Sequence, residues 1–309
     1  MKKELIEYLN DLLKCHYNNN AKIDSVEILE SQLYRVIYTL RLKSPKGIND
    51  FVLHFRKRSF DKKADFQAMK LAESSGVSTP RLIYYDLTGE NPFGTPFFIQ
   101  EFIIAQKLLE RKDWFKKNPR CLFKNLEKLH SIKTTKPTTP DLQNLKKYKR
   151  DCLSQLSGKQ IIDVRLLEEM FELVIDLYCA IDLSFIPSTL LHGDLHYSNI
   201  LVTEGNKFYF IDWEMTSYGD YCKDLAYFKA RALDYMYRGG KETTSLEIFK
   251  ASLSYYKSTF NDSSIEERMR YYLSAQYLEL IWRCSIPRIS QQWLPFYFNK
   301  LNDYIFKEK

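Results

Sequence analysis

The residues between Leu191 and Trp213 have the types and spacing that phosphoryl transfer requires. Asp194 stands five residues before Asn199, and Asp212 follows thirteen residues after Asn199. A carboxylate such as Asp194 can orient an attacking hydroxyl and accept its proton, while two oxygen ligands hold Mg²⁺ against the phosphates. Because Mg²⁺ prefers oxygen ligands and needs few from the protein, Asn199 and Asp212 form a sufficient pair.

The surrounding residues predict the element that positions this pair. Residues 200–202 and 208–211 are short apolar runs on either side of the turn Glu204-Gly205-Asn206. Such a pattern predicts a β-hairpin. Asn199 would enter the first strand and Asp212 would leave the second. A hairpin brings those two ends together, so we expect both side chains to reach one metal ion.

This stretch resembles the aminoglycoside phosphotransferase and choline kinase family. The resemblance rests on His-Gly-Asp-x-x-x-x-Asn from His192, on Ile-Asp-Trp from Ile211, and on the downstream Gly219-Asp220 and Asp224-Leu225-Ala226. It implies an α+β, bilobal protein-kinase-like fold that transfers the γ-phosphate of ATP or GTP to a hydroxyl, with Mg²⁺ as cofactor. It also implies that His192 braces the loop and that Asp220 and Asp224 are structural. The alternative for this stretch is a buried polar turn with capping carboxylates.

Composition narrows the class of protein. The chain has 309 residues with 45% hydrophobic content, enough for two lobes with a sizeable core. Its six scattered cysteines form no Cys-x-x-Cys pair, which favours reduced thiols and a cytoplasmic protein. We expect no membrane span and no signal peptide. Residues 101–150 hold 14 Lys/Arg against 5 Asp/Glu, but without the aromatic interleaving of a single-strand nucleic-acid binder.

The order of elements agrees with the resemblance. An amphipathic helix from Leu5 to Leu13 precedes strands expected at 25–30, 33–43 and 50–59, a helix at 64–74, and strands at 82–85 and 97–99. This is the order of a kinase amino-terminal lobe, which we place at 1–102 as the nucleotide-binding part. Residues 103–309 would form the second lobe. We expect helices there at 121–132, 148–156, 166–181, 224–237, 245–260, 265–283 and 293–306.

The nucleotide-binding positions depart from the family pattern. The first turn lacks the glycines that let backbone N–H groups approach phosphate, although Ser31 offers a hydroxyl. The third strand has His54 where the family has its phosphate-binding cation, and Arg56 lies on the same face because strand side chains alternate. Asp65 takes the place of the helix glutamate and would raise the pKa of His54 if the two pair. Either His54 or Arg56 is therefore the phosphate contact.

The segment around Gln100 resembles a kinase hinge. An adenine binds such a segment through backbone groups, here the Gln100 carbonyl and the Phe102 N–H. The acceptor pocket is expected between the catalytic loop and the C-terminal helices. Aromatic and acidic side chains there suit a cationic alcohol through cation–π contacts and ion pairs, although core packing is the alternative for each tryptophan. The candidates are Trp213, Glu214, Tyr218, Glu279 and Trp282.

Three functions are compatible with these residues. The first is a kinase of a small molecule, such as an aminoglycoside-like antibiotic, a choline-like aminoalcohol or a sugar. The second is a protein kinase, which the absence of an Ala-Pro-Glu segment disfavours. The third is a non-catalytic, pseudokinase-like binding protein. The missing glycine loop and strand lysine favour this third reading, whereas the intact Asp194, Asn199 and Asp212 argue against it.

Overall fold

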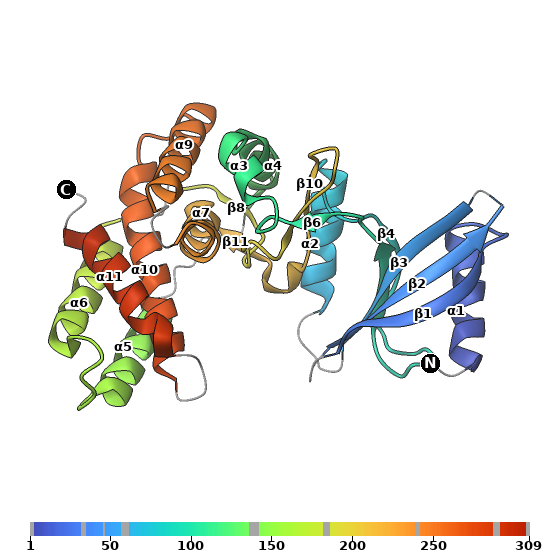
Figure 1. Ribbon diagram of the computed structural model, residues 1–309, viewed down its shortest axis with the longest axis horizontal. Helices are drawn as coiled ribbons and strands as arrows, with labels where there is room; N and C mark the ends of the chain where they lie inside the picture. The colour runs from blue at the N-terminus through green and yellow to red at the C-terminus, as the bar shows by residue number, and fades with distance from the viewer. Residues whose placement is uncertain are drawn as a thin grey trace. The chain divides into compact units, whose positions relative to one another are not determined.

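The computed structural model describes residues 3–31, 35–45, 47–56, 62–135, 142–181, 186–238, 242–286 and 291–306, which form two compact units (Figure 1). The first unit comprises residues 1–106 and 201–213, and the second comprises residues 107–200 and 214–309. By backbone contacts the first unit extends to Gln106, and residues 201–213 group with it. The division into lobes at 1–102 and 103–309 stays a prediction.

The first unit is built on a five-stranded sheet with the order β1-β2-β3-β5-β4. All its neighbouring strands are antiparallel, and β5 pairs with β3 on one side and β4 on the other. Each of the predicted strands is present. The strands are β1 (Lys22–Ser31), β2 (Arg35–Ser44), β3 (Gly47–Arg56), β4 (Leu82–Asp86) and β5 (Phe97–Glu101), and the helix between β3 and β4 is α2 (Lys62–Ser74).

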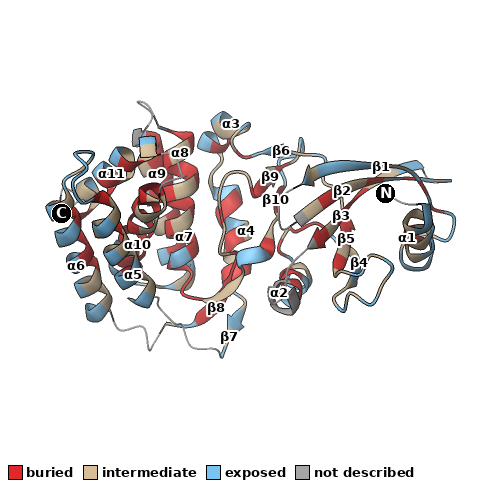
Figure 2. Cartoon of the chain, turned by 90° about the horizontal axis from the view of Figure 1, so that it is seen from below, coloured by how far each residue is buried: buried red, intermediate tan, exposed pale blue. Residues whose placement is uncertain are grey.

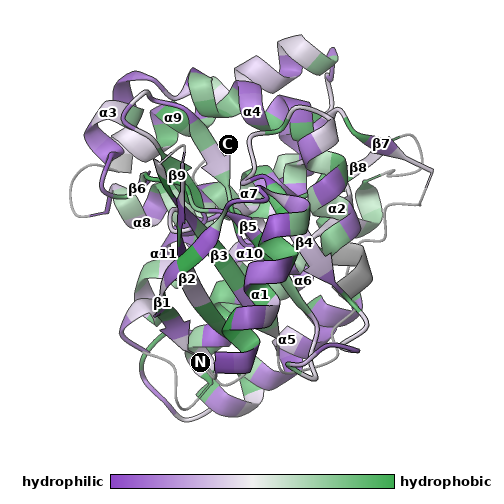
Figure 3. Cartoon of the chain, turned by 90° about the vertical axis from the view of Figure 1, so that its right-hand side faces the viewer, coloured by the Kyte–Doolittle hydropathy of each residue, from purple (hydrophilic) through white to green (hydrophobic). Residues whose placement is uncertain are grey.

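The opening helix α1 (Lys3–His16) covers one face of this sheet. Its apolar side chains Leu9 and Leu13 are buried against a core that includes Leu40, Phe51 and Ile99 from the strands. Figure 3 shows hydrophilic residues on the outward side of α1 and hydrophobic residues on the strands behind it. Apolar residues that recur every 3.6 positions in α1 and every second position in the strands thus face the same core.

The segment from Leu191 to Trp213 contains the predicted hairpin. Strands β9 (Ile200–Val202) and β10 (Phe208–Phe210) pair in a small sheet with the order β10-β9-β6, where β6 is Gln106–Lys107. Asn206 turns the chain between them with a φ of 60°. The Phe210 N–H donates to the Ser78 carbonyl at 2.9 Å, and the Trp213 Nε1–H donates to Thr79 Oγ1 at 3.1 Å. These bonds explain why the hairpin groups with the first unit.

The second unit is mainly helical. Helix α10 (Ile265–Ser285) has buried residues around its whole circumference and lies at the centre of the unit (Figure 2). A small antiparallel sheet, with the order β11-β8-β7, carries the chain into and out of the catalytic loop. The strands of this sheet are β7 (Lys133–Thr134), β8 (Ser188–Leu191) and β11 (Ser217–Gly219). Besides α10, the long helices of the second unit are α4 (Arg120–His130), α5 (Leu142–Leu156), α6 (Val164–Ala180), α9 (Glu242–Phe260) and α11 (Leu294–Phe306), and α3 (Lys112–Lys117) is a short helix.

One expected helix is interrupted. The single helix predicted at 224–237 consists of α7 (Cys222–Phe228), a π-helical turn η2 (Lys229–Leu233) and α8 (Asp234–Met236). The Asp234 N–H donates to the Lys229 carbonyl, and the Lys229 Nζ binds the buried Asp234 carboxylate. Ser245 and Tyr277 donate to the same carboxylate. The buried Lys229–Asp234 charge pair and its hydrogen bonds therefore hold the π-turn in place. Such turns are frequent at functional sites.

Two further expectations concern the whole chain. No helix in the described ranges is long and apolar enough to cross a membrane. All six cysteines are free thiols, and Cys152, Cys222 and Cys284 are buried.

Candidate active site

The loop that carries Asp194 depends on a glycine. Gly193 has a φ of 78°, in the left-handed region that favours glycine. A Cβ at this position would lie 1.9 Å from the Met215 carbonyl oxygen, so the two backbone segments approach as closely as they can. The loop then closes on itself, because the His196 N–H donates to the Asp194 carbonyl and the Asn199 N–H donates to the His196 carbonyl, each at 3.0 Å.

Asp224 holds this loop in place. Its carboxylate accepts the N–H groups of His192 at 2.8 Å and Gly193 at 2.9 Å. His130 Nε2 lies 3.1 Å from the same carboxylate, and Tyr256 contacts the other nitrogen of His130 at 2.8 Å. Burial raises the pKa of Asp224, but the hydrogen bonds and the nearby histidines outweigh it and lower the pKa overall. The ionised Asp224 is a structural support for the loop, as is the His192 Nδ1, which accepts the Asp194 N–H at 3.3 Å.

The Asp194 carboxylate has three side-chain partners in the second unit. Tyr227 donates its hydroxyl to Oδ1, Asn199 Nδ2 donates to Oδ2 at 2.9 Å, and His196 Nε2 lies 3.4 Å from Oδ2. Burial raises the pKa of Asp194, but the bonds from His196 and Tyr227 and the histidine charges lower it to about 2. Asp194 is thus a weak, firmly oriented base that is ionised at neutral pH.

Asn199 has one group left for a metal. Both hydrogens of its amide are used on Asp194, because Nδ2 also donates to the Asp194 carbonyl at 3.0 Å. Its Oδ1 is an acceptor that neither of these bonds uses, which is the kind of hard oxygen that Mg²⁺ prefers. Asn199 precedes β9, and Asp212 follows β10 in the first unit with a φ of 65°. A non-glycine residue in this region is strained, and such strain is concentrated at functional sites.

The donor set fits Mg²⁺ better than a softer metal. No group of three or more His, Cys, Asp or Glu side chains suited to a metal occurs among the described residues. Mg²⁺ does not need such a group, since it keeps several waters and binds substrate phosphates together with one or two protein oxygens.

A family model confirms what these residues indicate. The model of the phosphotransferase enzyme family matches residues 38–254, which include the whole catalytic segment. The chain belongs to the phosphotransferase enzyme family. Among curated proteins, the LicA homolog of Mycoplasma capricolum subsp. capricolum is 31% identical over 110 residues. That match covers 36% of this chain, and the chain spans 42% of the length of this relative.

Solved structures of similar proteins show the same protein-kinase-like fold. A spectinomycin phosphotransferase with ADP and spectinomycin is 15% identical, with a TM-score of 0.65 and 98% of each chain covered. A choline/ethanolamine kinase family protein from Mesorhizobium loti is 16% identical, with a TM-score of 0.59, covering 97% of this chain and 94% of that one. LicA in complex with AMP is 15% identical, with a TM-score of 0.60, covering 98% of this chain and 100% of that one. At these identities, the likeness shows the fold.

Among the predicted phosphate contacts of this phosphotransferase, His54 is already engaged. Gln100 Nε2 lies 3.0 Å from His54 Nε2, and the His54 ring stacks on Phe98 with 4.3 Å between ring centres. His54 Nε2 is therefore already hydrogen-bonded to the side chain of Gln100. The side chains of Arg56 and Asp65 lie outside the described residues, so the expected His54–Asp65 pair lies outside them as well. Ser31 is exposed at the end of β1, paired with Val36.

The N–H group of Phe102, predicted to bind adenine at the hinge, already has a backbone partner. The Phe102 N–H donates to the Asp50 carbonyl at 3.1 Å, which continues the β3–β5 ladder and makes this N–H unavailable to an adenine. The Glu101 N–H donates to the Arg81 carbonyl on the opposite side of β5, so successive N–H groups point alternately toward the two neighbouring segments. The next N–H with the same direction as Glu101 belongs to Ile103, which has no hydrogen bond in the described part of the chain. The side chain of Gln100 is buried and makes a hydrogen bond with the His54 ring.

The two tryptophans among the predicted acceptor residues have partners within their own units. Trp213 is 5% exposed and donates to Thr79 and to the Phe210 carbonyl, so it is a core residue of the first unit. Trp282 stacks on Tyr148 with 4.4 Å between ring centres and donates to Asp151. Glu214 is exposed and Tyr218 is half-buried in the second unit.

Glu279 is not a free carboxylate. Arg283 donates to Glu279 Oε1 through Nε at 2.8 Å and Nη2 at 2.6 Å, and Arg231 Nη2 lies 3.4 Å from the same oxygen. Gln276 donates to Oε2 at 3.2 Å. A carboxylate with two guanidinium partners has no net charge left to attract a cation.

Tyr227 and Arg231 are functional candidates that the sequence did not suggest. Tyr227 reaches Asp194 from α7, and the Arg231 guanidinium lies 4.6 Å from the centre of the Tyr227 ring. Their four-residue spacing places them on one face of a helix, which is the only signal in the sequence.

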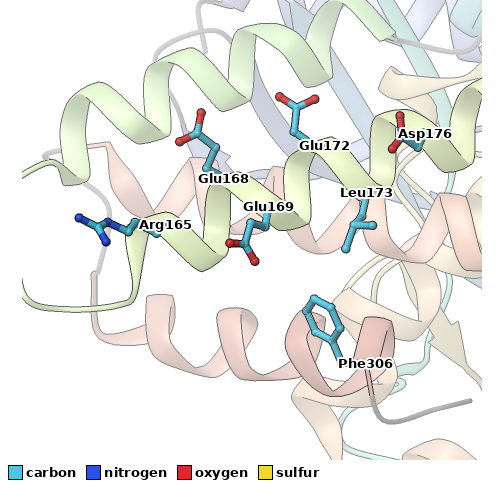
Figure 4. Close-up of a pocket in the computed structure, with 7 residues that line it drawn as sticks. All are labelled: Arg165, Glu168, Glu169, Glu172, Leu173, Asp176 and Phe306. Carbon is cyan, nitrogen blue, oxygen red and sulfur yellow. The ribbon is translucent and has the colours of Figure 1, made fainter.

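Some acidic residues of the second unit line a hollow that contains none of the predicted site residues. Figure 4 shows a hollow on α6 and the end of α11, where acidic side chains of α6 line the surface. Lys149 of α5 neutralises two of them, Glu168 and Glu172. None of the predicted site residues lines this hollow. The excess of 22 Asp/Glu over 17 Lys/Arg in residues 151–309 is therefore weak support for a cationic acceptor at Asp194.

Proposed function

We propose that this protein transfers the γ-phosphate of ATP to a hydroxyl group of a small molecule. The observation that carries the proposal is the Asp194 carboxylate, which Tyr227, Asn199 and His196 hold in one orientation on a loop braced by Asp224. Structures of relatives with ADP or AMP support a nucleotide as the donor.

The step is a balanced substitution at phosphorus. The acceptor oxygen forms a bond to the γ-phosphorus, and the bond from that phosphorus to the β,γ-bridging oxygen breaks, so ADP leaves with that oxygen. The acceptor proton passes to Asp194 and then to solvent. Because the transition state is loose, the acceptor oxygen remains protonated until late, and orientation by Asp194 matters more than base strength. A pKa of about 2 is consistent with that role.

Mg²⁺ fits the residues present. We propose that Asn199 Oδ1 and the Asp212 carboxylate hold it; when bound, Mg²⁺ neutralises charge on the β- and γ-phosphates. On the nucleotide side, we propose Arg56 as the phosphate contact, since His54 Nε2 is already bonded to the side chain of Gln100. For the adenine we propose the Ile103 N–H in place of that of Phe102. A cytoplasmic location agrees with six free thiols.

The test compares two variants in a nucleotide-consumption assay over a panel of alcohols, with mass spectrometry of the products. Asp194→Asn should keep nucleotide binding and lower turnover by about 10²-fold or more, the scale of a general base. Asp212→Ala should remove the Mg²⁺-dependent part of nucleotide affinity, measured by calorimetry. If the wild type binds nucleotide without consuming it in the presence of any acceptor, the pseudokinase reading replaces this one.

A further inference from the structure

Positive charge outweighs negative charge next to the catalytic carboxylate. Asp194 contacts Tyr227, Tyr227 contacts Arg231, and Glu279 joins Arg231 to Arg283. Beyond Asp194 itself, this chain of contacts has two guanidinium groups and one carboxylate. The cluster formed by Arg231, Glu279 and Arg283 therefore has a net charge of +1, which lies on the far side of Tyr227 from the Asp194 carboxylate along this chain of contacts.

The two arginines are positioned rather than free. Glu279 is a shared acceptor, and Gln276 fixes its second oxygen. The Arg231 side chain is 18% exposed, and its Nε–H is buried without a hydrogen-bond partner in the described part of the chain. Arg283 is 44% exposed. The π-turn η2, fixed by the buried Lys229–Asp234 pair, sets the direction from which Arg231 approaches.

The aromatic side chains that could bind a cation are covered by cations of the protein. The Arg238 guanidinium lies 4.3 Å from the centre of the Tyr235 ring and 4.5 Å from that of Trp293. Tyr197, three residues after Asp194, stacks on the other side of this group, with 4.6 Å between its ring and Tyr235. A cationic acceptor would have to displace Arg238 before it could use these rings.

Trp282 shows the same arrangement independently. One neighbour of its ring is Tyr148, and the Lys147 Nζ lies 5.6 Å from the ring centre. Glu279 therefore already has two guanidinium partners, and the rings of Trp282, Tyr235 and Trp293 each have a cation of the protein beside them.

We infer that the acceptor carries a carboxylate or phosphate group beside the hydroxyl that is phosphorylated, and that Arg231 and Arg283 bind this anionic group. A planar guanidinium matches both groups by paired hydrogen bonds, which is the geometry that arginine provides and lysine does not. The inference rests on the proposed function, because Asp194 defines where the hydroxyl lies. The phosphoryl-transfer step itself is unchanged.

The experiment uses acceptors that share a skeleton and differ in charge. One set is D-glucose, D-glucosamine, D-glucuronate and D-glucose 6-phosphate, and the other is ethylene glycol, ethanolamine and glycolate. Turnover with Mg²⁺ and ATP and binding by calorimetry are measured for each compound. An anion should exceed its neutral and cationic counterparts by about tenfold, the size of a hydrogen-bonded charge contact. Comparing glucuronate with glucose 6-phosphate distinguishes carboxylate from phosphate.

Single substitutions test whether Arg231 and Arg283 cause the preference for anionic acceptors. Arg231→Gln and Arg283→Gln should each reduce the preference for the anion about tenfold. Glu279→Gln should retain it, because the substitution releases guanidinium charge. Arg270→Gln, at an exposed position near the start of the same helix α10, is the matched control and should leave the preference unchanged.

Failure of the inference and failure of the proposed function give different results. A preference for the cationic or neutral compound, or a panel in which no anion binds, would overturn the inference. If that preferred compound is phosphorylated in an Asp194-dependent way, the proposed function stands. If anions bind through the two arginines while no Asp194-dependent nucleotide consumption occurs, the inference stands and the proposed function fails.

Discussion

Replacing Tyr227 with Phe separates two roles of the Asp194 carboxylate. The substitution keeps the ring beneath Arg231 and removes only the hydroxyl that donates to Asp194 Oδ1. A hydrogen bond to a charged group contributes about 1.5–3 kcal/mol. Since one pKa unit corresponds to about 1.4 kcal/mol, the pKa of Asp194 should rise by roughly one to two units from its value of about 2.

The two roles predict opposite changes in turnover. A stronger base removes a proton more readily, so turnover in Tyr227→Phe should rise severalfold if proton removal limits the rate. If orientation dominates, the less restrained carboxylate should lower turnover, by about tenfold. We expect the decrease, because Asp194 remains ionised near neutral pH in both proteins and only its restraint is lost.

The assay measures kcat at saturating nucleotide and acceptor from pH 4 to 9, as the ratio of variant to wild type. The ratio cancels the ionisation of the nucleotide. It should be near 0.1 and constant at high pH, and should fall further toward pH 4, because Asp194 takes up a proton at higher pH in the variant than in the wild type. Tyr255→Phe is the control, since Tyr255 also donates to a carboxylate, that of Glu127, away from the site. A ratio above one at neutral pH would refute the orienting role.

Two further substitutions test the loop and the nucleotide contact. Gly193→Ala should lower the free energy of unfolding by more than about 2 kcal/mol and abolish turnover, because its Cβ would meet the Met215 carbonyl, whereas Gly205→Ala, with no atom closer than 3.8 Å, should be mild in a thermal melt. Nucleotide affinity of the wild type should not change between pH 6 and 8 if Arg56 is the phosphate contact, because a guanidinium stays charged across this range. Arg56→Gln should weaken nucleotide binding by about tenfold, the scale of one charged hydrogen bond, and His54→Gln should not; a pH-dependent affinity lost in His54→Gln would reverse this assignment.

Local patterns were sufficient to predict much of the fold. The hairpin around Asn206 and the strands of the first unit follow from alternating apolar residues and turn residues within short windows. The helices were found by their period, with ends that differ by a few residues; α5, for example, begins at Leu142 rather than Tyr148. The spacing of Asp194, Asn199 and Asp212 identified the chemistry, because a loop followed by a hairpin constrains all three locally.

What the sequence could not indicate depends on contacts between distant segments. Trp213 directly follows Asp212, the proposed metal ligand. Its indole N–H donates to Thr79, which is far away in the sequence, and the ring is buried in the core of the first unit. Glu279 pairs with Arg283 four residues on, a spacing that the sequence shows, but its second partner Arg231 comes from a different helix. The π-turn at Lys229 is invisible to a 3.6-residue period, since it is stabilised by Ser245 and Tyr277 from elsewhere.

The support of the catalytic loop by Asp224 has a consequence for how such a protein changes its substrate. His130, Tyr256 and Asp224 hold the loop through backbone groups, and none of them belongs to the cluster formed by Arg231, Glu279 and Arg283. Side chains of that cluster can therefore be exchanged without loosening the loop. A directed-evolution library confined to those positions should yield folded proteins with new acceptors at high frequency, whereas one that includes Asp224 should yield mainly proteins that no longer fold.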